Sequence, residues 1–467
     1  MIDRSDIQGL VFGSYARKPA SCVLLIRFGE GDAARWLARL VPEVSSALSA
    51  ERHTSVCSNV AFTFRGLERL ALPPPTLAQF SSEFRHGMAH PARSLVLGDS
   101  GEDDPRSWEF HDGADGGIDA VVLVYAVDAA RLEERLEALD ASAERFGLET
   151  TELPMYLPAD GREHFGFRMG VSEPSIPGRR RRGGTRLPLG EFLLGYRNAR
   201  GGRSEVPLAP RRLSTREPPR LVSDATAVAF GYNGSYLVLR KLEQRVAAFR
   251  RFAEQAARQG GASSAEHAAA RFIGRWPNGA PLALHPDALP TDPGSSRRFG
   301  YRETDALSHG CPLGAHVRRA NPRDALGPDA RRALRSANSH RLLRRGRLYG
   351  PRLEPGDDDD GSERGLVFLA LNADLGRQFE AVQGSQLNDA HFAGLRDERD
   401  PLLGQDTSGV APRRFSVPGE PVRRTISDVP RFVRVRGGAY FFLPSLSSLG
   451  YLADLRRTDD QAHRPSS

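Results

Sequence analysis

Cysteine is scarce in this chain, and the three that occur, Cys22, Cys57 and Cys311, stand far apart. No two of them form a CxxC pair, which argues against a metal–thiolate site, and an odd number argues against a disulfide framework. Long apolar runs are also missing. No stretch reaches the length of a membrane span, and the N-terminus lacks the apolar segment of a signal peptide. We therefore expect a protein of a reducing compartment, the cytoplasm, with no membrane as partner.

Lysine is almost absent, since Lys18 and Lys241 are the only two, and arginine supplies nearly all the positive charge behind a net charge of +7. The arginines are spread along the chain and do not form one stripe, so the charge does not indicate a nucleic-acid partner. One dense run, Arg179 to Arg182, lies in a stretch rich in glycine and proline. It is typical of a solvated loop, and a docking site for an anionic partner is the alternative.

The first half of the chain alternates segments rich in β-forming residues with segments of helical spacing. Their order, with strands before and after an amphipathic helix, is typical of a ferredoxin-like α+β half. The segments are strands at 20–28, 59–64 and 118–125 and helices at 32–41, 67–72 and 128–146.

The second half repeats this order in outline. A hairpin and strand are expected at 228–239 with a turn at Asn233 and Gly234, and later segments follow: helices at 243–257 and from 376, strands at 365–371 and 438–443. The predicted organisation is an N-terminal half at 1–178, a connecting loop at 179–219, a C-terminal half at 220–457 and a disordered tail at 458–467.

A stiff turn places one histidine between basic residues. The stretch Cys311 to Arg323 reads CPLGAHVRRANPR, in which Pro312 and Gly314 interrupt regular structure before His316. A neutral imidazole held in this way could bind iron through one ring nitrogen while a hydrogen bond fixes the other. The alternative for a lone histidine is a buried side chain whose hydrogen bonds are all made within the protein.

This stretch, followed by HRLLRRGRLYGP at His340 to Pro351, resembles the dye-decolorizing peroxidases, a family of haem proteins. Further stretches in the same order carry the resemblance: FGFRMGVSEPSIPG (165–178), GEFLLGYRN (190–198), NGSYLVLRKLEQRVAAF (233–249), IGRWPNGAPL (273–282) and RDPLLG (399–404). The resemblance implies an α+β fold of two ferredoxin-like halves, antiparallel sheets with peripheral helices, packed as a dimeric α+β barrel with haem between the lobes.

The resemblance also implies the site. His316 would be the proximal ligand of the iron of haem b, in the C-terminal half, and Arg344 the distal catalytic arginine that also meets the cofactor. Arg345 is the alternative if the alignment is shifted by one residue. The implied reactants are hydrogen peroxide and a small-molecule reductant. The resemblance leaves a homo-oligomer open.

The family carries a distal aspartate where this chain has Met169, between Gly166 and Gly170. A thioether cannot shuttle a proton, so peroxidase activity should be weakened or redirected. Met169 could fill the distal pocket, could ligate iron opposite His316 as in electron-transfer cytochromes, or could accompany a chemistry that Arg344 supports alone. A haem protein of electron transfer, sensing or transport is therefore the alternative function.

Several residues have secondary roles under this interpretation. Asp400 is expected behind His316, where a carboxylate would raise the ligand's basicity, although it could equally serve a turn. Arg318 and Arg319 could meet haem propionates or be solvated. Three carboxylates could replace the distal aspartate: Asp160, Glu163 and Glu173. Three tryptophans could relay electrons from bulky substrates: Trp36, Trp108 and Trp276.

Overall fold

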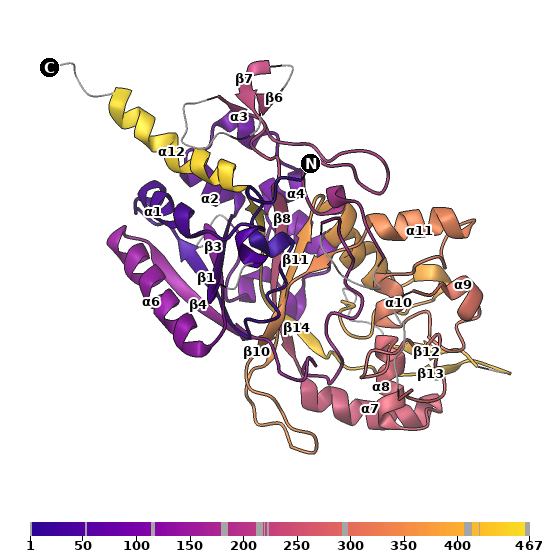
Figure 1. Cartoon of the computed structure of the whole chain (residues 1–467). Coiled ribbons are helices and arrows are strands. Elements are labelled where there is room, and N and C mark those ends of the chain that lie inside the picture. Colours follow the sequence, from indigo (N-terminus) through magenta and orange to yellow (C-terminus); the bar gives the residue numbers. More distant parts are fainter. Residues whose placement is uncertain are drawn as a thin grey trace.

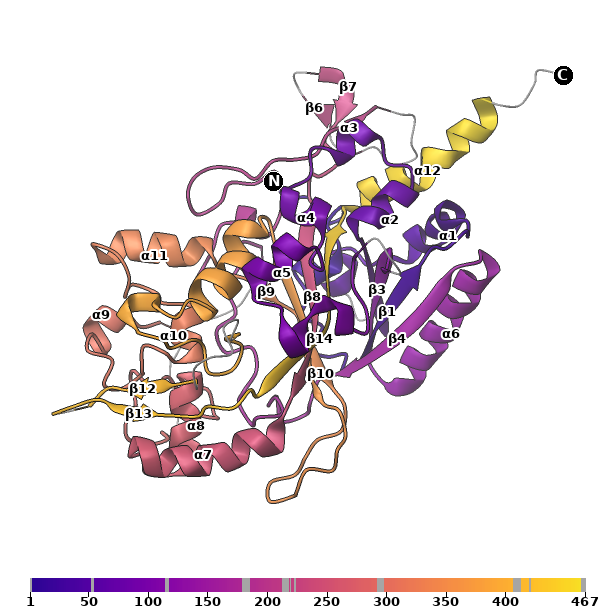
Figure 2. The same ribbon diagram turned by 180° about the vertical axis from the view of Figure 1, so that it is seen from behind.

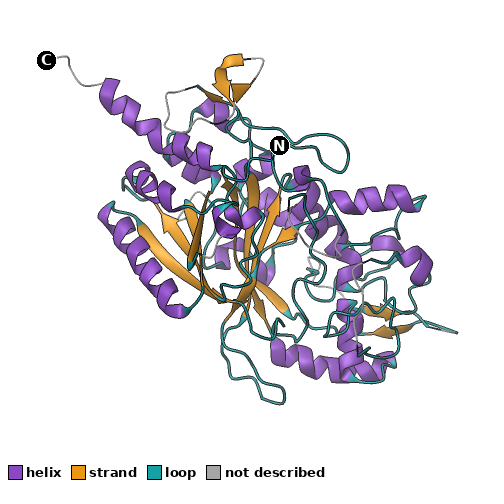
Figure 3. Cartoon of the chain, viewed as in Figure 1, coloured by secondary structure: helices purple, strands orange, loops and turns teal. Residues whose placement is uncertain are grey.

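The computed structural model describes residues 2–462 except 52–53, 114–116, 179–184, 212–217, 219, 222–223, 292–297, 406–412 and 420. The arginine run at 179–182 lies outside the described residues. Figure 1 shows strands in the centre of the molecule with helices on both sides, and Figure 3 separates the two kinds of element by colour. No helix of the described part is both long and apolar enough to cross a bilayer.

One antiparallel sheet of nine strands organises the chain. In spatial order its strands are β10 (Arg347–Tyr349), β4 (Glu149–Tyr156), β1 (Ala20–Arg27), β3 (Ala120–Ala126), β2 (Val56–Phe62), β14 (Val433–Leu443), β8 (Ser235–Gln244), β11 (Gly365–Asn372) and β9 (Leu343–Arg344). Because β10 also pairs with β11, the sheet closes on itself and leaves only β9 outside the ring.

The ring consists of two ferredoxin-like halves. Strands β4, β1, β3 and β2 lie in the order 4-1-3-2 of that motif, and β14, β8, β11 and β10 repeat the order in the second half. The halves join through two narrow registered contacts, Phe62 with Phe442 and Tyr156 with Leu348. The predicted fold, two ferredoxin-like halves in a dimeric α+β barrel, is confirmed.

Alternation along the strands creates two cores, because successive side chains point to opposite faces. On β1, Val23 and Leu25 join a core that includes the N-terminal Ile7 and Leu10. Cys22, Leu24 and Ile26 of the same strand join the other core, which the helices cover.

Helices of the first half pack on one side of the barrel: α1 (Ala33–Leu40), α2 (Phe64–Arg69) and α6 (Ala129–Arg145). Aspartate side chains start two of them, since Asp32 accepts the backbone N–H of Arg35 and Asp128 that of Arg131, as N-caps do. Short helices α3 (Pro74–Leu77), α4 (Ser82–His86) and α5 (Pro91–Leu97) follow α2. The C-terminal α12 (Leu446–Ala462) contacts α1 and continues through residues 458–462, which the sequence assigns to a tail.

Helices of the second half lie on the opposite side, as the views in Figures 1 and 2 agree. They are α7 (Val246–Gly260), α8 (Ala265–Ile273), α9 (Tyr301–Thr304), α10 (His316–Ala320) and α11 (Ala330–Ser339), with the small sheet β12 (Phe415–Val417) and β13 (Arg424–Ile426) beside them. A π-helix, η7 (Gly376–Leu387), contacts α10 and α5.

Two further expectations from the sequence differ from the structure. Strand β4 was not expected, because its residues 149–152 are polar and partly exposed and lack a β-forming run. The hairpin expected at 228–239 is wrong: β7 (Asp224–Val228) pairs with β5 (Ala209–Pro210) and β6 (Arg220–Leu221) in a separate sheet, and β8 pairs with β11 and β14.

Candidate functional site

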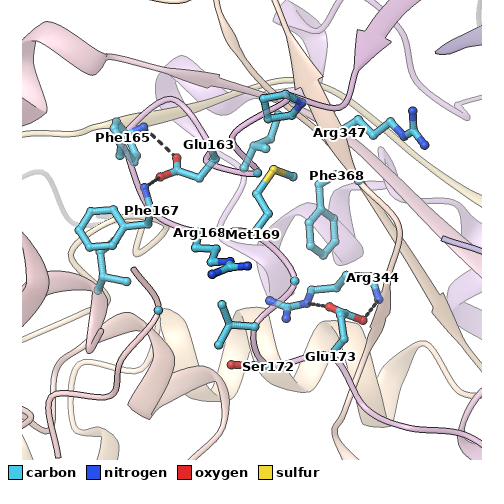
Figure 4. Close-up of a pocket in the computed structure, with 18 of the residues that line it drawn as sticks. Glu163, Phe165, Phe167, Arg168, Met169, Ser172, Glu173, Arg344, Arg347 and Phe368 are labelled. Atoms are coloured by element: carbon cyan, nitrogen blue, oxygen red, sulfur yellow. Dashed lines mark hydrogen bonds and ion pairs between the residues drawn. The ribbon is translucent and has the colours of Figure 1, made fainter. Parts of the chain in front are cut away.

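A cavity of about 820 Å³ lies against the helix-covered face of the C-terminal strands. Strands β8, β9, β11 and β14 supply one wall, through Leu242, Arg344, Phe368 and Val433. The facing wall comes from the ends of α8 and the start of α10, where His316 lies. The loop at 157–173, from the first half of the chain, forms the third wall (Figure 4).

His316 is fixed by a buried carboxylate. Its Nδ1 lies 2.9 Å from Oδ2 of Asp400, and the Asp400 side chain is fully buried. Since a carboxylate only accepts hydrogen bonds, Nδ1 carries the proton, and Nε2 of a neutral imidazole is left with a free lone pair. His316 lines the cavity and keeps 24% of its side chain exposed. The ring can therefore offer Nε2 to a metal.

The structure thus brings together two residues that lie far apart in the sequence. Oδ1 of Asp400 accepts the backbone N–H groups of Leu402 (2.9 Å) and Leu403 (2.7 Å), so the carboxylate itself is held rigidly. Burial alone would raise the pKa of Asp400, but the neighbouring His316 ring, through its hydrogen bond, and the N–H of Leu403 hold that pKa below its usual value. The carboxylate stays ionised beside the imidazole.

Met169 enters the cavity from a tight loop. Gly166 (φ 98°) and Gly170 (φ 68°) bracket it in the left-handed region that favours glycine, and its N–H donates to the carbonyl of Gly161 at 2.8 Å. The side chain is half-buried, and Figure 4 shows its sulfur directed into the cavity. The position offers neither a proton acceptor nor a charge.

Arg344 and Arg345 point in different directions. Arg344 lines the cavity with 42% of its side chain exposed, and its Nε and N donate to the two carboxylate oxygens of Glu173 at 2.7 and 3.1 Å. Arg345 is buried and donates to the carbonyls of Leu10 and Val11, both at 2.8 Å. The guanidinium accessible to a ligand is therefore that of Arg344.

The carboxylates suggested as substitutes for the distal aspartate all line the cavity but are engaged elsewhere. Glu173 is 7% exposed and bound to Arg344. Glu163 accepts the N–H groups of Phe165 and Phe167 (2.9 and 2.8 Å) and the amide of Gln244, and burial raises its pKa. Asp160 is exposed and pairs with Arg352 at 3.0 Å.

Arg318 and Arg319 do not reach the cavity. Arg318 is 2% exposed, donates to Asp305 (2.8 Å) and the Cys311 carbonyl (2.7 Å), and lies over the ring of Tyr301. Arg319 is fully buried and donates to backbone carbonyls of Gln386 and Asp389. The expectation that they are solvated is wrong, and neither lines the cavity as a propionate-binding residue would.

An arginine that the sequence did not single out does line the cavity. Arg275 is 5% exposed and lines the cavity. Its Nη1 donates to the carbonyl of Gly279 at 2.7 Å, while its Nε and Nη2 have no hydrogen-bond partner among the described residues. Burial lowers its pKa to about 10, so it remains charged at neutral pH. Two buried, unsatisfied donors fit an anionic group in the cavity.

The structure also ranks the tryptophans by position. Trp276 lines the cavity and its ring lies 5.1 Å from that of His267. Trp36 is a residue of α1 that packs in the core, and the ring of Trp108 lies 5.8 Å from the guanidinium of Arg240. Neither of these two lines the cavity.

These features fit a haem. No group of three or more His, Cys, Asp or Glu side chains in the described part could hold a metal alone, so His316 does not belong to an all-protein metal site there. The volume is within the range of cofactor pockets, and the free donors of Arg275 suit carboxylates.

No family model matches the chain, but comparisons with individual proteins do. The chain is 32% identical over 374 residues to a multifunctional dye peroxidase, DyP2, of Amycolatopsis sp., covering 74% of each chain. It is 27% identical over 490 aligned positions to the dye-decolorizing peroxidase AauDyP1 of Auricularia auricula-judae, covering 96% of this chain and 86% of the relative.

Solved structures agree. The crystal structure of AauDyP complexed with imidazole matches with a TM-score of 0.77 at 25% identity, covering 97% of this chain and 100% of that chain. The DyP-type peroxidase AnaPX of Anabaena sp. matches with a TM-score of 0.75 at 24% identity, covering 96% and 94%. The second match shows likeness of fold alone.

Proposed function

The chain belongs to the dye-decolorizing peroxidases, and on that premise we propose that it is a haem peroxidase that uses hydrogen peroxide to oxidise a small-molecule reductant. The observation that carries the proposal is the buried His316–Asp400 pair at 2.9 Å on the wall of a cofactor-sized cavity. A buried carboxylate behind a metal-binding imidazole fixes its tautomer and raises its basicity.

The cofactor would be haem b, held without covalent bonds. The three cysteines are buried, and none stands in a CxxCH sequence that could attach haem. His316 would bind the iron through Nε2, and Arg275 would receive a propionate. Haem, when bound, supplies the iron that exchanges electrons with peroxide.

The distal residues of this chain would stabilise charge during peroxide cleavage but would not accept the proton of peroxide. Arg344 is permanently charged and can stabilise negative charge as the O–O bond breaks, while Glu173 fixes the direction of its guanidinium. Met169 cannot accept the proton of peroxide. Peroxide turnover should therefore be weaker than with an aspartate at this position.

A second function is favoured by one observation: Met169 directs its sulfur into the cavity that His316 also lines. A protein in which His316 and Met169 both held the iron would transfer electrons, sense or carry haem, and would not turn over peroxide.

The absorption spectrum of the purified haem-loaded protein, recorded with and without peroxide, tests both. A high-spin ferric spectrum that changes with peroxide and returns on adding a reductant supports the peroxidase. A low-spin spectrum that becomes high-spin in Met169→Ala supports axial ligation instead. A protein that stays colourless when supplied with haem refutes both proposals.

A further inference from the structure

Met169 differs from the other methionines of the described chain in what its sulfur meets. Met88 and Met155 are 0% and 3% exposed and pack in the two cores. Met169 is half-buried and lines the cavity, with its sulfur pointing into the open volume. Any small oxidant that enters the cavity therefore meets this thioether.

No other described sulfur competes there. The thiols of Cys22, Cys57 and Cys311 are all buried. Burial raises the pKa of Cys311 to about 12, and that of Cys22 to about 12 as well, so both stay protonated and weakly nucleophilic. A thioether needs no deprotonation to react, which leaves Met169 as the reactive sulfur of the cavity.

We propose that Met169 is a modification site, converted to methionine sulfoxide by the hydrogen peroxide that the cavity admits. The inference rests on the proposed use of peroxide. The sulfur lone pair forms a bond to one peroxide oxygen as the O–O bond breaks. The other oxygen leaves as water, taking up the proton released from the first. Sulfur loses two electrons and peroxide gains two, so no further reactant is required.

The sulfoxide changes the distal wall. A flexible apolar group becomes a polar one whose oxygen accepts hydrogen bonds, in a cavity lined by the guanidinium donors of Arg344, Arg168 and Arg275. The sulfur keeps only one of its two lone pairs, and that pair is a poorer donor to iron than those of the thioether. The protein's spectrum and peroxide response therefore change with its own history of peroxide exposure.

The test measures oxidation at each methionine in the haem-loaded full chain. The protein is treated with a few equivalents of hydrogen peroxide beside a methionine-containing reference peptide, and a gain of one oxygen is quantified by peptide mass spectrometry. Met169 should be oxidised at least about tenfold faster than the reference peptide, because peroxide is held beside it. Met155 serves as the internal control and should remain unmodified.

Two variants distinguish specific oxidation of Met169 from unspecific oxidation of the protein by peroxide. Met169→Leu should abolish the slow spectral change that follows peroxide treatment, whereas Met155→Leu should retain it. Methionine sulfoxide reductase should reverse the change in the unmodified sequence.

The outcomes remain distinguishable from those of the proposed function. If haem is bound and peroxide consumed while Met169 is oxidised no faster than Met155 or the reference peptide, the inference is overturned and the peroxidase stands. If haem is bound and peroxide is not consumed, the proposed function fails, and unmodified Met169 then overturns the inference too.

Discussion

The His316 side and the Met169 side of the cavity differ in what holds their side chains. His316 is fixed by a fully buried carboxylate, and two backbone N–H groups fix that carboxylate in turn. Met169 makes only a backbone hydrogen bond and projects an unbranched apolar side chain. Arg344, on the distal side, is tied to Glu173. Under the proposed function, binding a cofactor and transferring a proton at it are separate properties, and the His316–Asp400 pair would serve the first.

The largest effect should come from removing the metal ligand. His316→Ala should lower haem retention by more than about tenfold, because it removes the imidazole that Asp400 holds at the cavity wall. Haem content after reconstitution and gel filtration measures it. His309→Ala is the matched control, since His309 is exposed and lies in the same segment. If His316→Ala retained haem with an unchanged spectrum, His316 would not be the iron ligand.

Restoring a carboxylate at the distal position should have the next largest effect. Met169→Asp should raise the initial rate of peroxide turnover by roughly 10²–10⁴-fold, the usual worth of a positioned general acid–base group. Stopped-flow kinetics with a dye or phenol as reductant measure it. The asparagine of Met169→Asn has nearly the same size as aspartate but accepts no proton, so this variant should gain little peroxide turnover. Equal rates for the Asp and Asn variants would show that the lack of a proton acceptor at position 169 does not limit peroxide turnover.

A smaller effect is expected behind the imidazole. Asp400→Asn keeps the size of the side chain but removes its charge, and should lower haem affinity or turnover by roughly 10–100-fold. Haem titration and peroxide turnover, measured on the same preparation, distinguish an effect on haem affinity from an effect on turnover. Asp305→Asn is the control, because Asp305 is a buried turn carboxylate that accepts the N–H groups of Gly310 and Cys311 without meeting His316. If both variants behave alike, Asp400 acts only through the fold.

Much of the barrel could be predicted because its strands follow local rules. β1, β3 and β11 are dense runs of β-forming residues, and Asp32 and Asp128 mark helix starts. β4 escaped prediction because exposed polar residues fill its first half. The pairing of β10 with both β4 and β11, which closes the ring, joins short segments far apart in sequence and leaves no local signal.

Residues at motif positions could be proposed for the site from the sequence. Residues that only the packing of the fold brings to the cavity could not. His316, Asp400, Met169 and Arg344 came from motif positions, and the structure brings the first two into contact. Nothing in the neighbouring residues tells a buried arginine from a solvated one. Long-range packing places Arg275 in the cavity and turns Arg318 toward Asp305, and neither placement has a local signal in the sequence.

The smallest effect concerns Asp160, an exposed carboxylate on the distal wall. The hydrogen bond from Arg352 holds its pKa below the usual value. A carboxylate with a lowered folded-state pKa adds stability above its unfolded pKa and loses it as the pH falls through the folded value. Asp160→Asn should therefore lower the free energy of unfolding by less than about 1 kcal/mol at pH 7, with salt reducing the difference. Urea unfolding at several pH values should show the two proteins converging in acid.

Peroxide turnover in the same variant tests the comparison directly. Because Asp160 is held by Arg352 on an exposed loop, it should not act as the distal proton acceptor, and Asp160→Asn should turn over peroxide at the unmodified rate. A loss of tenfold or more, at unchanged haem content, would mean that Asp160 reaches the bound peroxide. The Met169 side would then possess a base of its own, supplied by a carboxylate nine residues before the family position.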